Sequence, residues 1–296
     1  MIKDIVDLVT HLRKYFMDLK RIIIGLSIAL IISTLFVVIP AYNIICLLLI
    51  ILISSLALWE FYNLLICGGV PSSKKLGITA GIIFSISTWY YMMENISDNI
   101  LWSIMAFVVI ATFYKLLTYK SMRKGLEHGL GTFLGFMYIP FLFSFFIRIF
   151  LSGDDLNQPA FTAFYFILCT KISDTGGYFI GSKFGKNKIA KNISPKKSWE
   201  GFFGGIIFCL IINLIWWKFI GSNTNSFIPL FHSIILSFLF PLFATAGDLV
   251  ESLFKRAVDQ KDSSSITHGI GGILDMIDSI LFTAPMFYIY LTFLLA

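Results

Sequence analysis

Charged residues are scarce in this chain of 296 residues. Asp, Glu, Lys and Arg make up only 14% of it, whereas 57% is hydrophobic. A soluble domain carries about a quarter charged residues, so this composition excludes an ordinary soluble enzyme and predicts a protein embedded in a membrane. A second, soluble domain is not expected either, because the longest polar stretches, near 182–200 and 248–278, only separate apolar runs.

Cysteine is also scarce, and its pattern carries little chemistry. The cysteines show no CxxC spacing, which gives no support for a zinc site or a disulfide framework; they are Cys46, Cys67, Cys169 and Cys209. The net charge of +6 is read as a topology signal, because basic residues of membrane proteins gather in cytoplasmic loops. We therefore expect a lipid bilayer, and no nucleic acid, as the partner of the basic residues.

Long apolar runs, by contrast, are abundant. A helix needs about 20 apolar residues to cross a bilayer, and the sequence predicts about nine such spans, at 22–39, 42–66, 76–93, 100–119, 127–150, 159–181, 201–220, 227–247 and 279–296. Apolar residues at steps of three and four over 1–21 predict an amphipathic helix on the membrane surface. The predicted fold is thus an all-α, polytopic integral membrane protein with an amphipathic N-terminal helix.

Basic residues alternate between the predicted loops. All Lys and Arg residues except Arg148, Lys171 and Lys218 lie in or beside every second loop or in the N-terminal helix. By the positive-inside rule, the N-terminus is cytoplasmic and the C-terminus lies outside. We expect a multi-pass protein of the cytoplasmic (inner) membrane, divided into about five N-terminal spans over 22–158 and a catalytic membrane domain over 159–296. That domain has about four helices and two cytoplasmic loops.

The first of these loops follows a charged position inside an apolar run. Asp174 comes three residues after Lys171, so the two share a face of a helix and could pair. A buried structural ion pair is the plainer explanation, but a charge within a membrane span is a functional candidate by default. Three glycines beside it allow either close helix packing or approach of a ligand to the backbone: Gly176, Gly177 and Gly181.

Farther along, Ser194, Lys196 and Lys197 precede Trp199 at the mouth of the next span. A helix N-terminus favours anions, phosphate among them, so this cluster indicates a phosphate-binding position. Topology and attraction to anionic lipid would also account for the lysines. The stretch GSKFGKNK lacks the Gly-x4-Gly-Lys-Ser/Thr spacing, which excludes a P-loop.

The second loop is flanked by acids. Asp248 ends one span, and Asp275 and Asp278 share a face at the entrance of the next if 273–296 is helical. Such grouped oxygens suit Mg²⁺ bound together with substrate phosphates, and two metal ions could clamp the attacking and leaving oxygens. Nearby cations suit phosphate oxygens; they are Lys255, Arg256 and Lys261. The plainer alternative is a solvated hairpin with helix-capping acids, but the combination favours a site that transfers or displaces phosphoryl groups.

At these residues the sequence resembles the phosphatidate cytidylyltransferases, also called CDP-diacylglycerol synthases. The family signature matches in spacing at Ser252, Lys255, Arg256, Lys261, Asp262, Gly271, Gly272, Asp275 and Asp278. The upstream residues Gly247, Asp248, Leu249 and Glu251 and the blocks 173–186 and 193–201 also resemble the family. The match departs at Met276, where the family has Arg, and at Ile270, where it has His; the nearest histidine is His268. The first half of the chain matches only as a string of spans.

The resemblance implies the reaction of CTP with phosphatidate to CDP-diacylglycerol and diphosphate, with Mg²⁺ and room for a second cation. It implies that metal ions are held by Asp248, Asp275 and Asp278, and that phosphates are neutralised by Lys255, Arg256 and Lys261. Substrate-binding positions would be Asp174, Ser194, Lys196, Lys197, Glu251, Ser252, Asp262, Gly271 and Gly272. A homodimer is a further expectation from the family.

Two other functions stay open at this point. A CTP-dependent kinase of a polyprenol or phytol-type alcohol would use the same nucleotide but release CDP and a phosphorylated lipid. A transporter could use Asp174 and Lys171 on an ion path, but it predicts inverted half-repeats with broken helices. Both charged loops lie in the second half of the chain, which argues against such repeats.

Overall fold

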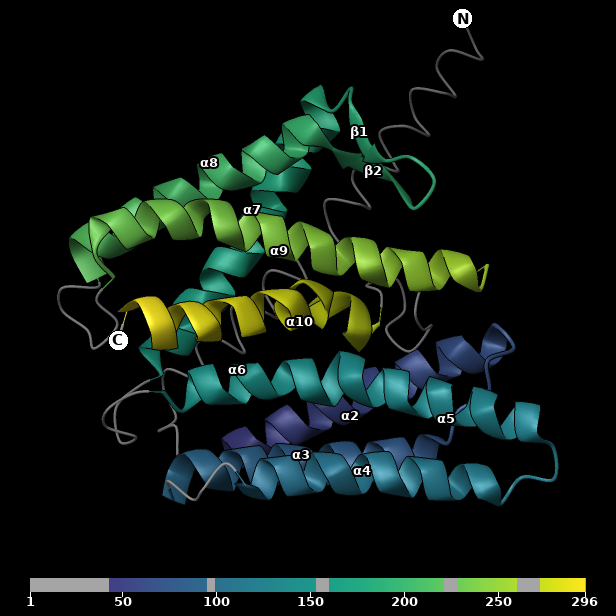
Figure 1. Ribbon diagram of the computed structural model, residues 1–296. Coiled ribbons are helices and arrows are strands. Elements are labelled where there is room, and N and C mark those ends of the chain that lie inside the picture. Colours follow the sequence, from purple (N-terminus) through teal and green to yellow (C-terminus); the bar gives the residue numbers. More distant parts are fainter. Residues whose placement is uncertain (1–42, 95–98, 153–159, 221–227, 260–271, 296) are drawn as a thin grey trace, which may run out of the picture.

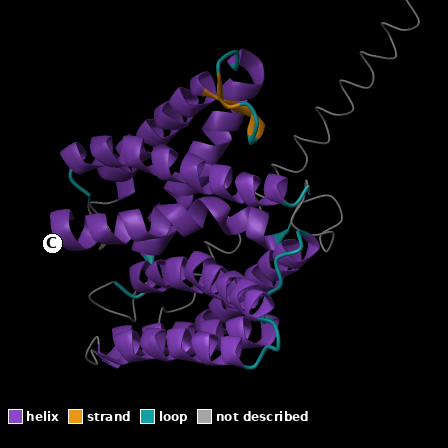
Figure 2. Cartoon of the chain, turned by 45° about the vertical axis from the view of Figure 1, so that its right-hand side comes forward, coloured by secondary structure: helices purple, strands orange, loops and turns teal. Residues whose placement is uncertain are grey.

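The structure is a computed structural model, and it describes residues 43–94, 99–152, 160–220, 228–259 and 272–295 (Figure 1). The predicted amphipathic helix over 1–21 and the first predicted span, 22–39, lie outside these residues. The described chain is a bundle of helices with one short hairpin (Figure 2). The first half contributes α2 (Ile44–Cys67), α3 (Lys74–Glu94), α4 (Asn99–Leu117), α5 (Met122–Phe136), the π-helical η1 (Met137–Phe141) and α6 (Leu142–Phe150).

The second half holds the two polar loops and the longest of the helices within the described residues. Its elements are α7 (Phe161–Phe184), β1 (Lys188–Ala190), β2 (Ser194–Ser198), α8 (Trp199–Ile215), η2 (Trp216–Ile220), α9 (Leu230–Ala257), α10 (Ile273–Tyr290) and η4 (Leu291–Leu295). Figure 1 shows α9 and α10 lying side by side across the middle of the bundle, with α7 and α8 on one side of them and α2 to α6 on the other.

Within the described residues, six helical segments are long and apolar enough to cross a membrane: Ile44–Cys67, Lys74–Glu94, Met122–Phe150, Trp199–Phe219, Leu230–Ala257 and Ile273–Leu294. The predicted span 100–119 corresponds to the shorter apolar helix Asn99–Lys115. The predicted span 159–181 corresponds to α7, which is 24 residues long. The all-α membrane architecture is therefore confirmed, whereas the number of nine spans stays a prediction.

Two stretches that the sequence assigns to loops have regular structure. The lysine-rich segment after α7 forms an antiparallel hairpin in which Lys188 pairs with Ser198 and Ala190 with Ser194. Glu200 accepts hydrogen bonds from the backbone and side chain of Asn187, which ties the hairpin to the start of α8. In addition, α9 continues ten residues beyond the predicted end of its span at 247, to Ala257. Its polar last turns are held by pairs at helical spacing, such as Glu251 with Lys255.

Glycines let α7 and α8 approach closely. A Cβ atom on Gly204 would lie 2.9 Å from the carbonyl oxygen of Gly176, and one on Gly201 would lie 2.8 Å from that of Gly177. Small residues at such positions favour helix association inside a membrane, where apolar burial gives little driving force. Close helix packing, one of the two roles predicted for these glycines, is confirmed at Gly176, whereas Gly177 also lines a cavity beside α8.

The first half of the chain supports the C-terminal part of α9 and the N-terminal part of α10. Phe254 of α9 packs on Phe61 of α2 and Tyr138 of η1, with ring centroids 5.0 and 5.2 Å apart. At the start of α10, the backbone N–H of Leu274 donates to the fully buried carboxylate of Glu60 on α2, at 2.8 Å. Glu60 thus caps the start of α10 from another helix, because the first N–H groups of a helix have no partner within it.

Candidate active site

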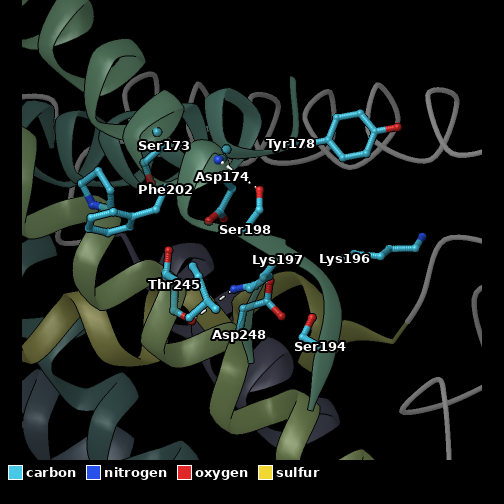
Figure 3. Close-up of a pocket in the computed structure, with 15 residues that line it drawn as sticks. Ser173, Asp174, Tyr178, Ser194, Lys196, Lys197, Ser198, Phe202, Thr245 and Asp248 are labelled. Atoms are coloured by element: carbon cyan, nitrogen blue, oxygen red, sulfur yellow. Dashed lines mark hydrogen bonds and ion pairs between the residues drawn. The ribbon is translucent and has the colours of Figure 1, made fainter. Parts of the chain in front are cut away.

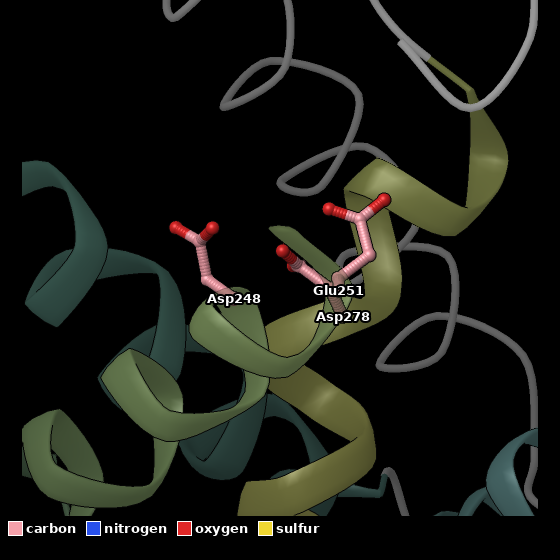
Figure 4. A group of neighbouring side chains, drawn as sticks. All are labelled: Asp248, Glu251 and Asp278. Carbon is pink, nitrogen blue, oxygen red and sulfur yellow. The ribbon is translucent and has the colours of Figure 1, made fainter. Parts of the chain in front are cut away.

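Three carboxylates from two helices form an acidic cluster. Asp248 and Glu251 stand one turn apart on α9, and Asp278 comes from α10. Each offers an oxygen within 4.8 Å of the others, and Figure 4 shows the side chains converging. Gly247 makes this possible, because a Cβ atom there would lie 2.4 Å from the backbone oxygen of Asp278. A larger residue would force α9 and α10 apart at the position where the acids meet.

The cluster has one buried oxygen without a partner. Glu251 is only 1% exposed, and its Oε1 atom accepts no hydrogen bond from the described residues. An unsatisfied buried carboxylate oxygen is costly. The donor set, oxygen atoms only, is the one that Mg²⁺ and similar hard cations prefer. The residues present therefore fit a divalent cation.

Two lysines flank the cluster. Lys255, 13% exposed, lies 2.6 Å from Oε2 of Glu251 and 2.6 Å from Oδ1 of Asp275. The other oxygen of Asp275 accepts the backbone N–H of Gly272, as part of the cap of α10. On the opposite side, Lys197 of β2 lies 2.8 Å from Asp248. Each lysine thus brings positive charge to the cluster, and Asp275 holds Lys255 in place.

A cavity of about 320 Å³ opens next to the cluster, between α7, β2, α8 and α9. Figure 3 shows Lys197 reaching across it from β2 toward Asp248 and the backbone oxygen of Thr245, at 3.1 Å from the latter. The wall includes the hydroxyls of Ser173, Ser194 and Ser198, the lysines Lys196 and Lys197, and the acids Asp174 and Asp248. Ser198 also caps α8 by accepting the N–H of Gly201. A helix N-terminus, hydroxyls and lysines together favour an anionic ligand.

Asp174 belongs to the wall of this cavity and to a polar link between α7 and α10. Lys171 lies 3.6 Å from Oδ2 of Asp174, so the predicted pair is confirmed. The same oxygen accepts a hydrogen bond from the hydroxyl of Ser279 at 2.9 Å. Lys171 also donates to Ser279 and to the backbone oxygen of Met276.

Comparison with known proteins identifies the family. Residues 19–294 match the model of the cytidylyltransferase family. The chain belongs to this family. It is 35% identical to a phosphatidate cytidylyltransferase of Bacillus subtilis (strain 168), over 74% of this chain and 81% of that protein. It is 32% identical to a protein of the same name from Staphylococcus haemolyticus, over 81% and 87%, and 45% identical to one from Staphylococcus aureus (strain COL), over 43% and 47%.

In this cytidylyltransferase, most of the predicted site residues lie together. Asp248 and Asp278 share the cluster, and Ser194, Lys196, Lys197 and Asp174 line one cavity. Asp275, which the sequence groups with the metal ligands, contacts Lys255 and the start of α10. Ser252 donates to Asp248 at 3.4 Å, and Arg256 donates to the backbone oxygen of Ile193 at 3.4 Å. Four residues lie outside the described ones: Lys261, Asp262, His268 and Gly271.

From the sequence, Glu251 is predicted as a substrate-binding position and not as a metal ligand. Glu251 comes three residues after Asp248, and the two share one face if the helix continues past residue 247. This spacing could have predicted that Glu251 joins the acidic cluster. Ser279 was also missed. A serine that follows an acid is common in sequences and does not by itself predict a functional role. The contacts of Ser279 with Lys171 and Asp174 show that it belongs to the site.

Proposed function

We propose that this protein is a phosphatidate cytidylyltransferase, which converts CTP and phosphatidate into CDP-diacylglycerol and diphosphate for phospholipid biosynthesis. A phosphate oxygen of the lipid forms a new bond to the α-phosphorus of CTP, and the bond from that phosphorus to the β-phosphate oxygen breaks. The observation that carries the proposal is the buried acidic cluster beside a lysine-lined cavity, in a member of the cytidylyltransferase family.

The cluster is proposed to bind Mg²⁺ through Asp248, Glu251 and Asp278, with a second cation as an extension of the same site. When bound, Mg²⁺ neutralises phosphate charge and aligns the reacting oxygens. We assign Asp275 to orienting Lys255, because both of its oxygens are engaged by Lys255 and Gly272. It thereby acts on the phosphates through that lysine.

Both substrates are anions and repel each other, so neutralisation and alignment must supply most of the catalysis. Lys196, Lys197 and Ser194 are proposed to bind the triphosphate or the lipid phosphate in the cavity, which also contains Asp174. Lys255, Arg256 and Lys261 are proposed to neutralise the phosphates, and Asp262 is a proposed substrate-binding position; Lys261 and Asp262 lie outside the described residues. Ser252, Gly271 and Gly272 are the remaining proposed substrate-binding positions. The mechanism needs no covalent nucleophile.

The membrane arrangement is part of the proposal. The middle of α7 and the polar ends of α9 and α10 meet at the site, and soluble CTP reaches it from the cytoplasm if the basic loops face inward. Phosphatidate reaches the same depth from the bilayer. A cytoplasmic N-terminus, an external C-terminus, location in the cytoplasmic membrane and a homodimer are the corresponding expectations.

Product analysis tests the function. Purified protein is supplied with Mg²⁺, CTP labelled in its α-phosphate and either phosphatidate or a polyprenol. With phosphatidate we expect a labelled CDP-lipid and unlabelled diphosphate. Release of CDP together with a phosphorylated lipid alcohol would instead indicate the kinase, and substrate movement without chemistry would indicate a transporter.

Asp278→Asn tests the cluster itself. It keeps the size of the side chain but removes a charged ligand, and we expect at least ~100-fold loss of kcat, because even residues behind the ligands cost 10- to 100-fold. The matched control is Asp259→Asn, at the exposed end of α9, where φ is 54° and Asn is well tolerated. Full activity of Asp278→Asn would refute the metal assignment.

A further inference from the structure

Lys171 stands outside the roles assigned so far. We propose that it is a positioning residue of the active site: it holds Asp174 on α7 and the segment of α10 that carries Asp278 in one fixed arrangement. The proposal deepens the proposed function and rests on it for its activity readout, whereas its metal-binding readout does not.

Lys171 has three polar partners at the interface of α7 and α10, two on α10 and one on its own helix. An ammonium group has three N–H donors and no acceptor. Lys171 Nζ lies 2.8 Å from the backbone oxygen of Met276, 3.0 Å from the hydroxyl of Ser279 and 3.6 Å from Oδ2 of Asp174. Its side chain is only 18% exposed. The charge is therefore used within the protein, between two helices, and not presented to solvent.

The contacts on α10 lie on both sides of Asp278 in the chain. Met276 precedes this acid by two residues, and Ser279 follows it directly. Lys171 thus fastens the backbone immediately around the one member of the acidic cluster that α10 supplies. A shift or rotation of this turn would move the Asp278 carboxylate relative to Asp248 and Glu251 on α9.

On α7, Lys171 orients the carboxylate of Asp174. Ser279 accepts a hydrogen bond from Lys171 and donates one to Oδ2 of Asp174. The contacts of Asp174 with Lys171 and Ser279 both use this one oxygen, and Asp174 also lines the cavity. Lys171 and Ser279 therefore orient the carboxylate as well as balance its charge.

The neighbouring lysines cannot take over this role. Lys197 contacts Asp248 and the backbone of Thr245, and Lys255 contacts Glu251 and Asp275. Each is held to a different acid by distances of 2.6 to 2.8 Å. Loss of Lys171 would remove the charged part of the link between Asp174 and the Asp278 turn and leave the hydrogen bond from Ser279 to Asp174.

The test uses the purified full chain and Mn²⁺ as a paramagnetic probe, with bound and free ion measured by EPR in the absence of substrate. Lys171→Met keeps the length of the side chain but removes the charge and donors. We expect it to weaken Mn²⁺ binding and to lower kcat for CDP-lipid formation, each by about 10- to 100-fold, as found when residues that orient metal ligands are removed. Lys171→Arg, which keeps charge and donors, should recover most of both.

The direction of the Mn²⁺ change separates positioning from simple charge balance. If Lys171 acted only as a positive charge near the acids, its removal would make the cluster more negative and Mn²⁺ would bind more tightly. Equal or tighter Mn²⁺ binding by folded Lys171→Met would overturn the proposal, as would failure of Lys171→Arg to recover binding. Lys218→Met, which removes an exposed lysine from η2, is the control and should match the wild type.

Ser279→Ala keeps the test decisive if Lys171→Met does not fold. It retains both charges and removes only the hydroxyl between them, so we expect weaker Mn²⁺ binding in the same direction and a smaller loss; unchanged binding would overturn the proposal. A wild-type protein that binds Mn²⁺ but forms no CDP-lipid would refute the proposed function alone, because the Mn²⁺ comparison would still decide the role of Lys171.

Discussion

At the residue scale, the acids of this site differ in their surroundings although they look alike in the sequence. Asp275 and Asp278 are three residues apart on α10, and the sequence assigns both to the metal. In the structure, Asp278 faces Asp248 and Glu251, whereas Asp275 faces Lys255 and the N–H of Gly272. Spacing along a helix predicts which residues share a face. It cannot predict which side chain of the next helix each one meets.

Lys255 provides a test at this scale. It is bound by two acids while only 13% exposed, so Lys255→Met leaves Glu251 and Asp275 close together without their shared cation. Removal of one partner from a buried ion pair costs about 3–5 kcal/mol. We expect a clearly lower thermal midpoint of unfolding in detergent and loss of CDP-lipid formation.

The control for that variant is Lys183→Met, which removes an exposed lysine near the end of α7 and should leave the midpoint unchanged. Lys255→Arg should retain part of the stability, because it keeps the charge. A Lys255→Met protein as stable as the wild type would contradict the assigned burial of the pair.

At the element scale, hydropathy predicted the helices well and their polar ends poorly. The apolar runs of α2, α3, α8 and α9 were placed within a few residues. The extension of α9 to Ala257 and the hairpin Lys188–Ser198 were missed, because both are polar and lack an apolar repeat. These are the segments that carry Glu251, Lys255, Lys196 and Lys197. Functional side chains are concentrated where the hydropathy signal ends.

Glu60 offers a test of how elements support one another. Its carboxylate caps α10 from another helix, at the N–H of Leu274, one residue before Asp275. Glu60→Ala would leave that buried N–H without this partner, at a cost of about 1–3 kcal/mol. We expect a lower thermal midpoint and reduced activity, whereas Glu60→Gln, whose amide oxygen still accepts a hydrogen bond, should retain most of both.

Glu94→Ala, at the exposed end of α3, controls for removal of an acid from a membrane helix. Equal behaviour of Glu60→Ala and Glu60→Gln would show that the charge, and not the cap, is what α10 requires. The comparison thereby separates the two roles of Glu60 at the N–H of Leu274, 2.8 Å away: hydrogen-bond acceptor and negative charge at the start of α10.

At the scale of the whole molecule, contacts gather the polar segments at one end of the bundle. Arg256 at the end of α9 reaches Ile193 of the hairpin, Lys197 reaches Asp248, and Glu60 of α2 reaches the start of α10. The charge alternation in the sequence predicted one common side for the two long loops, and this arrangement agrees with it (Figure 1). Which side of the membrane that is remains a prediction from the positive-inside rule alone.

Labelling of single cysteines tests the orientation. In a Cys67→Ser background, which removes the exposed native cysteine, Lys191→Cys lies in the hairpin turn and Glu94→Cys at the far end of α3. Because lysines and arginines concentrate at the hairpin end, we expect a membrane-impermeant maleimide added to intact cells to label Glu94→Cys only. Lys191→Cys should react after the membrane is opened, and a permeant maleimide should label both. The reverse pattern would place the acidic cluster outside, away from cytoplasmic CTP, and would contradict the proposed function together with the topology.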